Sequence, residues 1–253
     1  MNPSCWWRQC LGWCVHFYTA LGLVAAAAVA VLLVRGGAEA FRSAFLLMVV
    51  ATLIDATDGT FARWVRIKEV LPSFDGRRLD DLVDFLTYTF LPLLLIWRAG
   101  LLPQSCDAVL LLPLLASAYG FCQTSAKTDD GYFLGFPSYW NLVAFYLYTL
   151  QPLSGWFALG VVVVLSLLTF VPSRYLYPSQ RGRLNLITSL LGMLWAIFLV
   201  WMIWIMPDDS TRTLALLSLL FPAWYLGASW IISVRFWRRK RRRRREGMRV
   251  VLS

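Results

Sequence analysis

Four aspartates are the residues whose type and spacing best suit chemistry. Half of the 14 acidic residues, seven in number, lie within residues 55–84. Asp55 and Asp58 are three positions apart and Asp80 and Asp84 are four apart, so each pair shares one helix face. The apolar run MVVATLI leads directly into Asp55, which argues against a solvated charged loop. Four such charges at one membrane depth would repel each other, so they must take up protons or bind cations.

Clustered carboxylate oxygens are the ligands that hard divalent ions such as Mg²⁺ and Mn²⁺ prefer. Two such ions can hold a pyrophosphate and stabilise the attacking and leaving oxygens of a displacement. The spacing therefore predicts a metal-dependent transfer of a phosphate-linked group. Glu69 and Asp75 fit a solvated loop better. The single histidine, His16, excludes a Ser-His-Asp triad and a zinc site with several histidines.

The composition places this chemistry in a membrane. The chain has 253 residues, of which 59% are hydrophobic and 15% are charged, and its mean hydropathy is +0.62. Soluble domains carry roughly 25% charged residues. These values exclude a water-soluble enzyme, a disordered chain and a small disulfide-stabilised module.

Because about 20 apolar residues span a bilayer, we expect an all-α, polytopic helical membrane protein with about eight transmembrane helices. The predicted spans are 16–35, 41–65, 80–98, 102–123, 138–151, 154–173, 184–206 and 211–235. Residues 1–253 would form a single integral membrane catalytic domain. Its parts would be an interfacial segment (1–15), a core (16–183) with the motif 55–84, two extra helices (184–235) and a basic cytoplasmic tail (236–253).

Basic residues predict the orientation. Ten of the 24 basic residues lie between Arg235 and Arg249, and others gather in segments 63–78 and 174–183. With eight spans all of these fall on one side, which the positive-inside rule makes cytoplasmic. We therefore expect both termini and the aspartates to be cytoplasmic. The basic tail would bind anionic lipid or fix the topology, and we expect no nucleic-acid partner.

The motif resembles the signature of the CDP-alcohol phosphotransferases. It reads Asp55-x2-Asp58-Gly59-x2-Ala62-Arg63-x12-Gly76-x3-Asp80-x3-Asp84. The twelve-residue gap, where most of that family has eight residues, is similar to the bacterial phosphatidylcholine synthase branch. Residues 121–141 and 170–179 are also similar to that branch. The resemblance implies a six-helix catalytic core plus two C-terminal helices, a homodimer and a place in the bacterial inner membrane.

The resemblance also implies roles for the motif residues. Asp55, Asp58 and Asp80 would bind two Mn²⁺ or Mg²⁺ ions, and Asp84 would reach the second ion and act as the general base. The donor, CDP-diacylglycerol, would contact Asp55, Asp58, Gly59, Ala62, Arg63, Gly76 and Asp80. Arg63 suits a phosphate contact because its guanidinium forms charge-assisted hydrogen bonds. Membrane lipids would surround this site.

The acceptor alcohol is predicted to be choline, a quaternary ammonium of the kind that binds aromatic faces. Its candidate contacts, which include two carboxylates, are Tyr88, Tyr119, Asp129, Asp130, Tyr132, Phe133, Phe136, Tyr139 and Trp140. Tyrosine and tryptophan also gather at membrane interfaces without any ligand. Arg174 is a candidate for a lipid phosphate or a plain interface anchor.

The expected reaction therefore joins CDP-diacylglycerol and choline to give phosphatidylcholine and CMP. A phosphatidylserine- or phosphatidylinositol-type synthase is the nearest alternative. A divalent-metal transporter would carry polar groups through both halves of the membrane, whereas here they concentrate in one half. A lipid-surface scaffold that uses the basic tail would leave the buried carboxylates unexplained.

Overall fold

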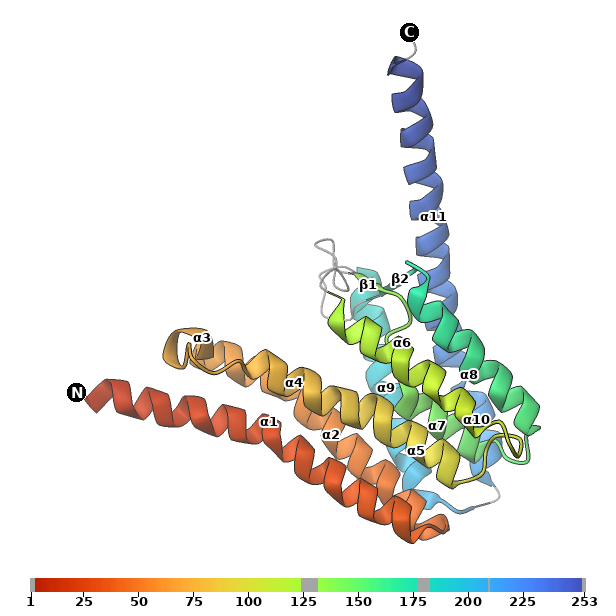
Figure 1. The fold of residues 1–253 in the computed structure, drawn as a ribbon, viewed down its shortest axis with the longest axis horizontal. Helices are drawn as coiled ribbons and strands as arrows, with labels where there is room; N and C mark the ends of the chain where they lie inside the picture. The colour runs from red at the N-terminus through yellow and green to blue at the C-terminus, as the bar shows by residue number, and fades with distance from the viewer. Residues whose placement is uncertain (1–2, 124–131, 177–182, 209, 252–253) are drawn as a thin grey trace.

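A computed structural model describes residues 3–123, 132–176, 183–208 and 210–251, and helices dominate them (Figure 1). The first helices are α1 (Pro3–Arg35), α2 (Ala38–Val65) and the short α3 (Ile67–Val70). A continuous helical rod follows, made of α4 (Gly76–Asp84), the π-helical η1 (Phe85–Phe90) and α5 (Leu91–Arg98). The later helices are η2 (Asp107–Leu110), α6 (Leu111–Cys122), α7 (Trp140–Thr149), α8 (Gly155–Phe170), α9 (Arg183–Ile205), α10 (Ser210–Ser218) and α11 (Leu220–Val251).

Every predicted span overlaps at least one of these helices, which fits an all-α membrane protein. Four described helical segments are long and apolar enough to cross a bilayer: Trp6–Arg35, Ala38–Val65, Ile187–Ile205 and Ser210–Arg239. Two further apolar helical segments, Asp107–Cys122 and Gly155–Phe170, are shorter. With a rise of about 1.5 Å per residue, the ten-residue α7 is about half the thickness of a hydrocarbon core.

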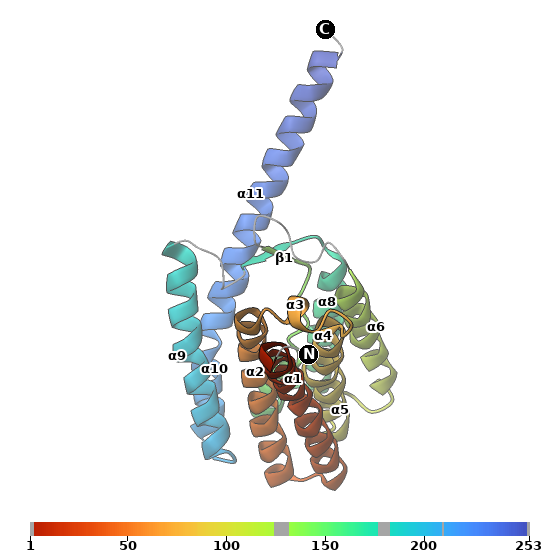
Figure 2. The same ribbon diagram turned by 90° about the vertical axis from the view of Figure 1, so that its left-hand side faces the viewer.

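Two predicted segment boundaries are not breaks in the structure. Helix α1 runs from Pro3 through residue 16, so the predicted interfacial segment and the first span are one helix. Helix α11 likewise continues past residue 236 into the basic tail and extends away from the bundle (Figures 1 and 2). No proline interrupts either stretch after Pro3 and Pro222. Because arginine is a strong helix former, a change in polarity alone does not end the helix.

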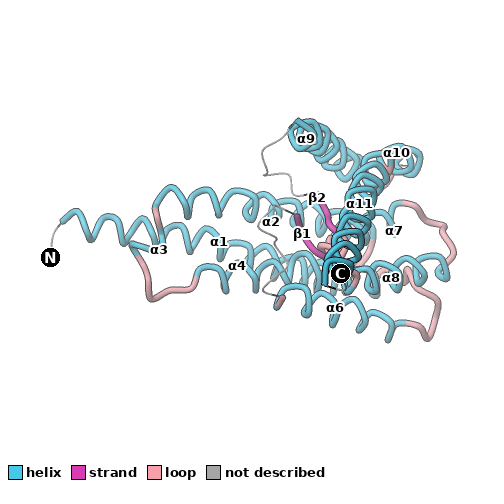
Figure 3. Tube along the Cα trace, turned by 90° about the horizontal axis from the view of Figure 1, so that it is seen from above, coloured by secondary structure: helices cyan, strands magenta, loops and turns pink. Residues whose placement is uncertain are grey.

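A small β-ladder was not predicted from the sequence. Strand β1 (Tyr132–Leu134) pairs antiparallel with β2 (Arg174–Leu176), with Phe133 opposite Tyr175 (Figure 3). The ladder joins the two segments, 121–141 and 170–179, that carry the similarity to one branch of the family. Ser233 of α11 accepts a hydrogen bond from the Arg174 backbone N–H at 2.6 Å, so the ladder is also attached to α11.

Buried apolar side chains form a core between the helices, and large apolar side chains also cover the outside. Leu33, Leu95, Trp140 and Val162 are among the fully buried side chains. Many large hydrophobic residues point outward, such as Trp156 on α8, which is 68% exposed. A bundle that is apolar on both its inside and its outside suits a lipid surrounding.

Helix α1 fixes the positions of the two helices that carry the motif, because it packs along both α2 and α4 (Figure 1). A Cβ added at Gly22 of α1 would overlap Val83 of α4. A Cβ added at Gly76 of α4 would lie 2.5 Å from His16 Cε1 of α1. These two glycines therefore permit a close helix approach that a side chain would prevent.

Candidate active site and metal centre

Three of the four motif aspartates converge. Asp55 of α2 and Asp80 and Asp84 of α4 present carboxylate oxygens that all lie within 4.8 Å of one another. All three residues are half-buried. Among the described residues, the buried Oδ1 atom of Asp84 has no hydrogen-bond partner. Three carboxylates at this spacing and burial repel one another strongly, and a bound cation would relieve that repulsion.

The donor set fits a hard divalent cation. The three ligands are all carboxylates, without the imidazole or thiolate groups that favour zinc or copper. The unpartnered Oδ1 atom of Asp84 points to the same conclusion, because a buried carboxylate oxygen normally has a donor or a cation beside it. Asp55, Asp80 and Asp84 are therefore the residues that would hold the ion.

Asp58 is not among the three carboxylates that the structure brings within 4.8 Å of one another. Its side chain is 6% exposed, and its Oδ2 accepts a hydrogen bond from Thr19 Oγ1 of α1 at 2.7 Å. Three residues along a helix correspond to about 300° of rotation, so Asp58 points about 60° away from Asp55. Its role as a metal ligand stays a prediction. Thr19 was missed from the sequence, although a threonine inside a long apolar run was a usable signal.

Tyr88 lies beside the cluster, but its contact differs from the one expected. Its hydroxyl donates a hydrogen bond of 2.7 Å to Asp55 Oδ2. Tyr88 belongs to η1, the π-helical turn that directly follows Asp84. Such wider turns inside helices occur frequently at functional sites. Tyr88 thus links the rod that carries Asp84 to the carboxylate on α2.

The predicted donor-binding residues continue along α2 from the cluster. Arg63 donates a hydrogen bond from Nη2 to Thr60 Oγ1 at 3.0 Å. A Cβ added at Gly59 would lie 3.4 Å from Arg63 Nη1, so the exposed guanidinium folds back over the glycine. Ala62 adds only a methyl group on this stretch of the helix. The close approach of Gly76 to His16 gives that glycine a packing role that the sequence did not suggest.

The predicted choline residues do not all remain candidates. Trp140 is fully buried, and its indole N–H donates to Ser117 Oγ at 2.9 Å, so it is a core residue. Tyr119 is 47% exposed, and its ring centroid lies 5.1 Å from that of Phe170. Tyr139 is also exposed. Asp129 and Asp130 lie outside the described residues.

Arg174 holds together the ladder and the last helix. Its guanidinium carbon lies 3.5 Å from the ring centroid of Phe236 on α11 and 5.2 Å from that of Tyr132 on β1. Both distances are within the range of cation–π interactions. Its predicted contact with a lipid phosphate stays a prediction.

Comparison with known proteins gives a consistent set of relatives, although no protein-family model matches the chain. A phosphatidylcholine synthase of Pseudomonas aeruginosa is 34% identical over 230 residues, which is 90% of this chain and 92% of that protein. One of Borreliella burgdorferi is 33% identical over 70% of this chain and 75% of its own length. One of Bradyrhizobium diazoefficiens is 39% identical over 72% and 67%.

Proposed function

The chain belongs to the phosphatidylcholine synthase family, and we propose that its aspartate cluster transfers the phosphatidyl group of CDP-diacylglycerol to choline. The products are phosphatidylcholine and CMP. The observation that carries this proposal is the convergence of Asp55, Asp80 and Asp84 in a chain that resembles these synthases along most of its length.

Asp84 is the general base of the proposed reaction. Its carboxylate has two oxygens, so one can face an ion while the other accepts a proton, and no donor among the described residues occupies Oδ1. It takes the proton of the choline hydroxyl as that oxygen bonds to the phosphorus esterified to diacylglycerol. The bond from this phosphorus to the oxygen of the CMP phosphate breaks, and CMP leaves with that oxygen. Asp55 is held in place by the hydrogen bond from the Tyr88 hydroxyl.

Asp55, Asp80 and Asp84, with Asp58 as a further ligand, would hold two Mn²⁺ or Mg²⁺ ions, which would neutralise charge at the pyrophosphate of the donor. The donor also lies against Gly59 and Ala62, whose small side chains leave room for a nucleotide. Arg63 contacts a donor phosphate, and Gly76 stands at the nucleotide end of the site. The exposed guanidinium of Arg63, within two turns of Asp58, supports this arrangement.

Choline enters from the side of Asp84. Tyr88 remains a candidate contact for choline, because this residue lies about one turn beyond Asp84 on the same helical rod. Tyr119, Tyr139, Asp129 and Asp130 remain further candidates for choline contacts, and Arg174 remains one for a lipid phosphate. Trp140 is left out of the proposed site because the core surrounds it completely.

The proposed setting is the bacterial inner membrane, with eight spans, both termini and the active site on the cytoplasmic side, and a homodimer as the working unit. The support is that arginine-rich parts gather at one end of the bundle. The loop around α3, the β-ladder and the far half of α11 all lie toward that end (Figure 2). The positive-inside rule makes this end cytoplasmic.

The test compares Asp84→Asn with Asp81→Asn. Both variants remove one negative charge from α4, but only Asp84 belongs to the converging group. General-base catalysis contributes about 10²–10⁴-fold, so kcat of Asp84→Asn should fall by that factor while Asp81→Asn stays within about threefold of the unmodified enzyme. Release of CMP and formation of phosphatidylcholine measure the rate. Near-normal turnover by Asp84→Asn would contradict the role of Asp84 as the general base.

A further inference from the structure

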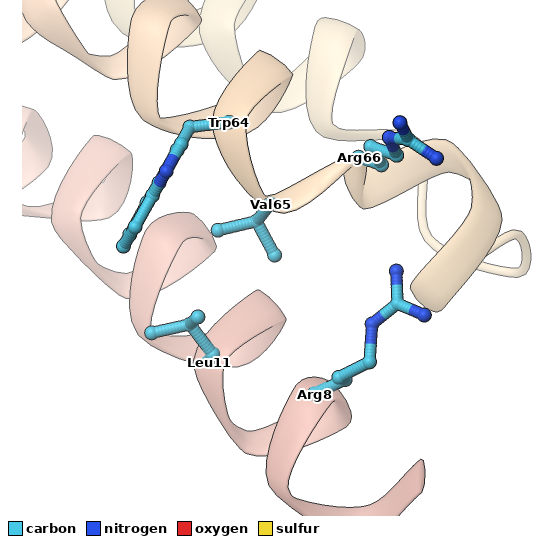
Figure 4. A pocket seen from close by; sticks show the side chains of 5 residues that line it. All are labelled: Arg8, Leu11, Trp64, Val65 and Arg66. Atoms are coloured by element: carbon cyan, nitrogen blue, oxygen red, sulfur yellow. The ribbon is translucent and has the colours of Figure 1, made fainter. Parts of the chain in front are cut away.

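A pocket at the N-terminal end of α1 is lined by none of the residues assigned to the proposed reaction. Its volume is about 200 Å³, and it lies between α1 and the C-terminal end of α2 (Figure 4). The residues that line it are Arg8, Leu11, Trp64, Val65 and Arg66. We propose that this pocket binds the phosphate group of an acidic membrane phospholipid.

Two arginines make the pocket positively charged. Both Arg8 and Arg66 are exposed, and within the part of the chain that the structure describes neither of them forms an ion pair. The pocket lining contains no acidic side chain to offset them. Guanidinium groups bind phosphate oxygens with two parallel hydrogen bonds, so two of them around one opening suit a phosphate.

The backbone at Arg66 adds a second reason. Arg66 ends α2 in the left-handed conformation, with φ 55° and ψ 51°, where glycine is the usual residue. Its N–H closes the helix on the carbonyl oxygens of Ala62 and Arg63. Glycine would form this turn without strain. An arginine at this position, at the edge of the pocket, therefore suggests that its side chain has a function other than ending the helix.

The remaining lining selects a lipid over a free phosphate ion. Leu11 and Val65 are apolar, and Trp64 is 75% exposed at the end of a helix long enough to span the membrane. Exposed tryptophans at such ends lie at the level of the lipid headgroups, and Trp6 and Trp7 of α1 are exposed as well. A ligand with a phosphate and adjoining acyl chains would match both kinds of lining.

The pocket is separate from the carboxylate cluster. None of its five lining residues is one of the eight named positions of the motif, although Trp64, Val65 and Arg66 lie in the twelve-residue gap after Arg63. Trp64 lies six residues beyond Asp58, which is about 9 Å along the helix axis. Substitutions in the pocket therefore test the proposal without removing a group from the reaction.

The experiment uses the purified full chain in phosphatidylcholine nanodiscs that contain a phosphatidylglycerol with a photoactivatable acyl chain. Cross-linked peptides are identified by mass spectrometry. We expect cross-links around residues 8–11 and 64–66. Competing unlabelled phosphatidylglycerol should suppress them, whereas added phosphatidylcholine should leave them unchanged. In the double variant Arg8→Gln/Arg66→Gln this labelling should fall roughly tenfold or more, while phosphatidyl transfer continues.

The matched control is Arg238→Gln/Arg239→Gln, which removes the same charge from the basic tail and should label like the unmodified enzyme. Equal labelling of the pocket variant and this control would overturn the proposal. If inorganic phosphate suppressed the labelling as strongly as phosphatidylglycerol does, the ligand of the pocket would not be a lipid. Suppression by CDP-diacylglycerol alone would assign the pocket to the donor instead. If the double variant does not fold, competition on the unmodified enzyme still decides between these outcomes.

Discussion

Two side chains outside the four-aspartate set hold members of that set in place. Thr19 donates to Asp58 and Tyr88 donates to Asp55, each at 2.7 Å. Neither bond could be predicted from the sequence, because each joins residues more than 30 positions apart. The aspartates themselves could be predicted, since their helical spacing and apolar flanks are local properties. That Asp55 converges with Asp80 and Asp84, while Asp58 bonds to Thr19, depends on the rotation of α2, which the structure supplies.

Tyr88→Phe should separate the two roles considered for this tyrosine. The change removes a hydrogen bond to a carboxylate, which contributes about 1.5–3 kcal/mol, so kcat should fall about 10- to 100-fold. The Mn²⁺ concentration for half-maximal activity should rise, and KM for choline should change less than about twofold, because phenylalanine keeps the aromatic face.

Tyr18→Phe is the control for this prediction. Tyr18 also bonds to α2, through Thr57 Oγ1 at 2.8 Å, but it touches no carboxylate of the motif. Its kinetics should match those of the unmodified enzyme. A Tyr88→Phe enzyme with a raised KM for choline and an unchanged metal dependence would instead place the tyrosine hydroxyl at the acceptor.

At the scale of the elements, α1 is the support on which the site is built. It holds α4 through the close approaches at Gly22 and Gly76, and Thr19 bonds it to Asp58 of α2. The apolar segments and their helical character could be predicted from composition. The π-helical η1 and the ladder of β1 and β2 could not, because six-residue and three-residue elements leave no periodic pattern and depend on their neighbours.

Gly22→Ala should destabilise the protein and misplace the aspartates of α4. The added methyl would overlap Val83, and overpacking of this kind costs about 1–3 kcal/mol. Thermal unfolding in detergent should occur at a lower temperature, and phosphatidyl transfer should fall in parallel. Adding Val83→Ala to the same chain should restore both properties in part.

Gly160→Ala is the matched control, because a Cβ at this position of α8 would meet no atom within 4 Å. An alanine in a helix is favoured over glycine by up to about 1 kcal/mol, so this variant should be as stable as the unmodified enzyme or more so. The same melting temperature and activity for both alanine variants would contradict the role given to the contact between α1 and α4.

At the scale of the whole molecule, the bundle and the basic tail are different parts of one chain. The basic residues concentrate in the far part of α11, which leaves the bundle (Figure 1), whereas the converging carboxylates belong to α2 and α4. Phe236, which covers the guanidinium of Arg174, still belongs to the packed part of α11. The catalytic and surface-binding properties should therefore be separable.

Truncation after Trp237 should leave catalysis intact and weaken binding to anionic surfaces. The cut removes nine basic residues and keeps Phe236. Each basic residue near an anionic membrane contributes about 1 kcal/mol, so the salt sensitivity of vesicle binding should fall clearly. Transfer rates in detergent should stay within about twofold of those of the full chain. A truncated enzyme that folds as a single species but has no activity would contradict this separation.

The most direct measurement of the central claim gives the purified full chain CDP-diacylglycerol, Mn²⁺ and one alcohol at a time, with CMP and the product lipid quantified together. The alcohols are choline, ethanolamine, serine, inositol and glycerol 3-phosphate. Choline should give one CMP for each phosphatidylcholine at a rate well above that of the others. Excess chelator should stop the reaction, and added Mn²⁺ or Mg²⁺ should restore it, because the carboxylates need cations to hold the pyrophosphate. Serine used as readily as choline, or full activity in excess chelator, would contradict the account.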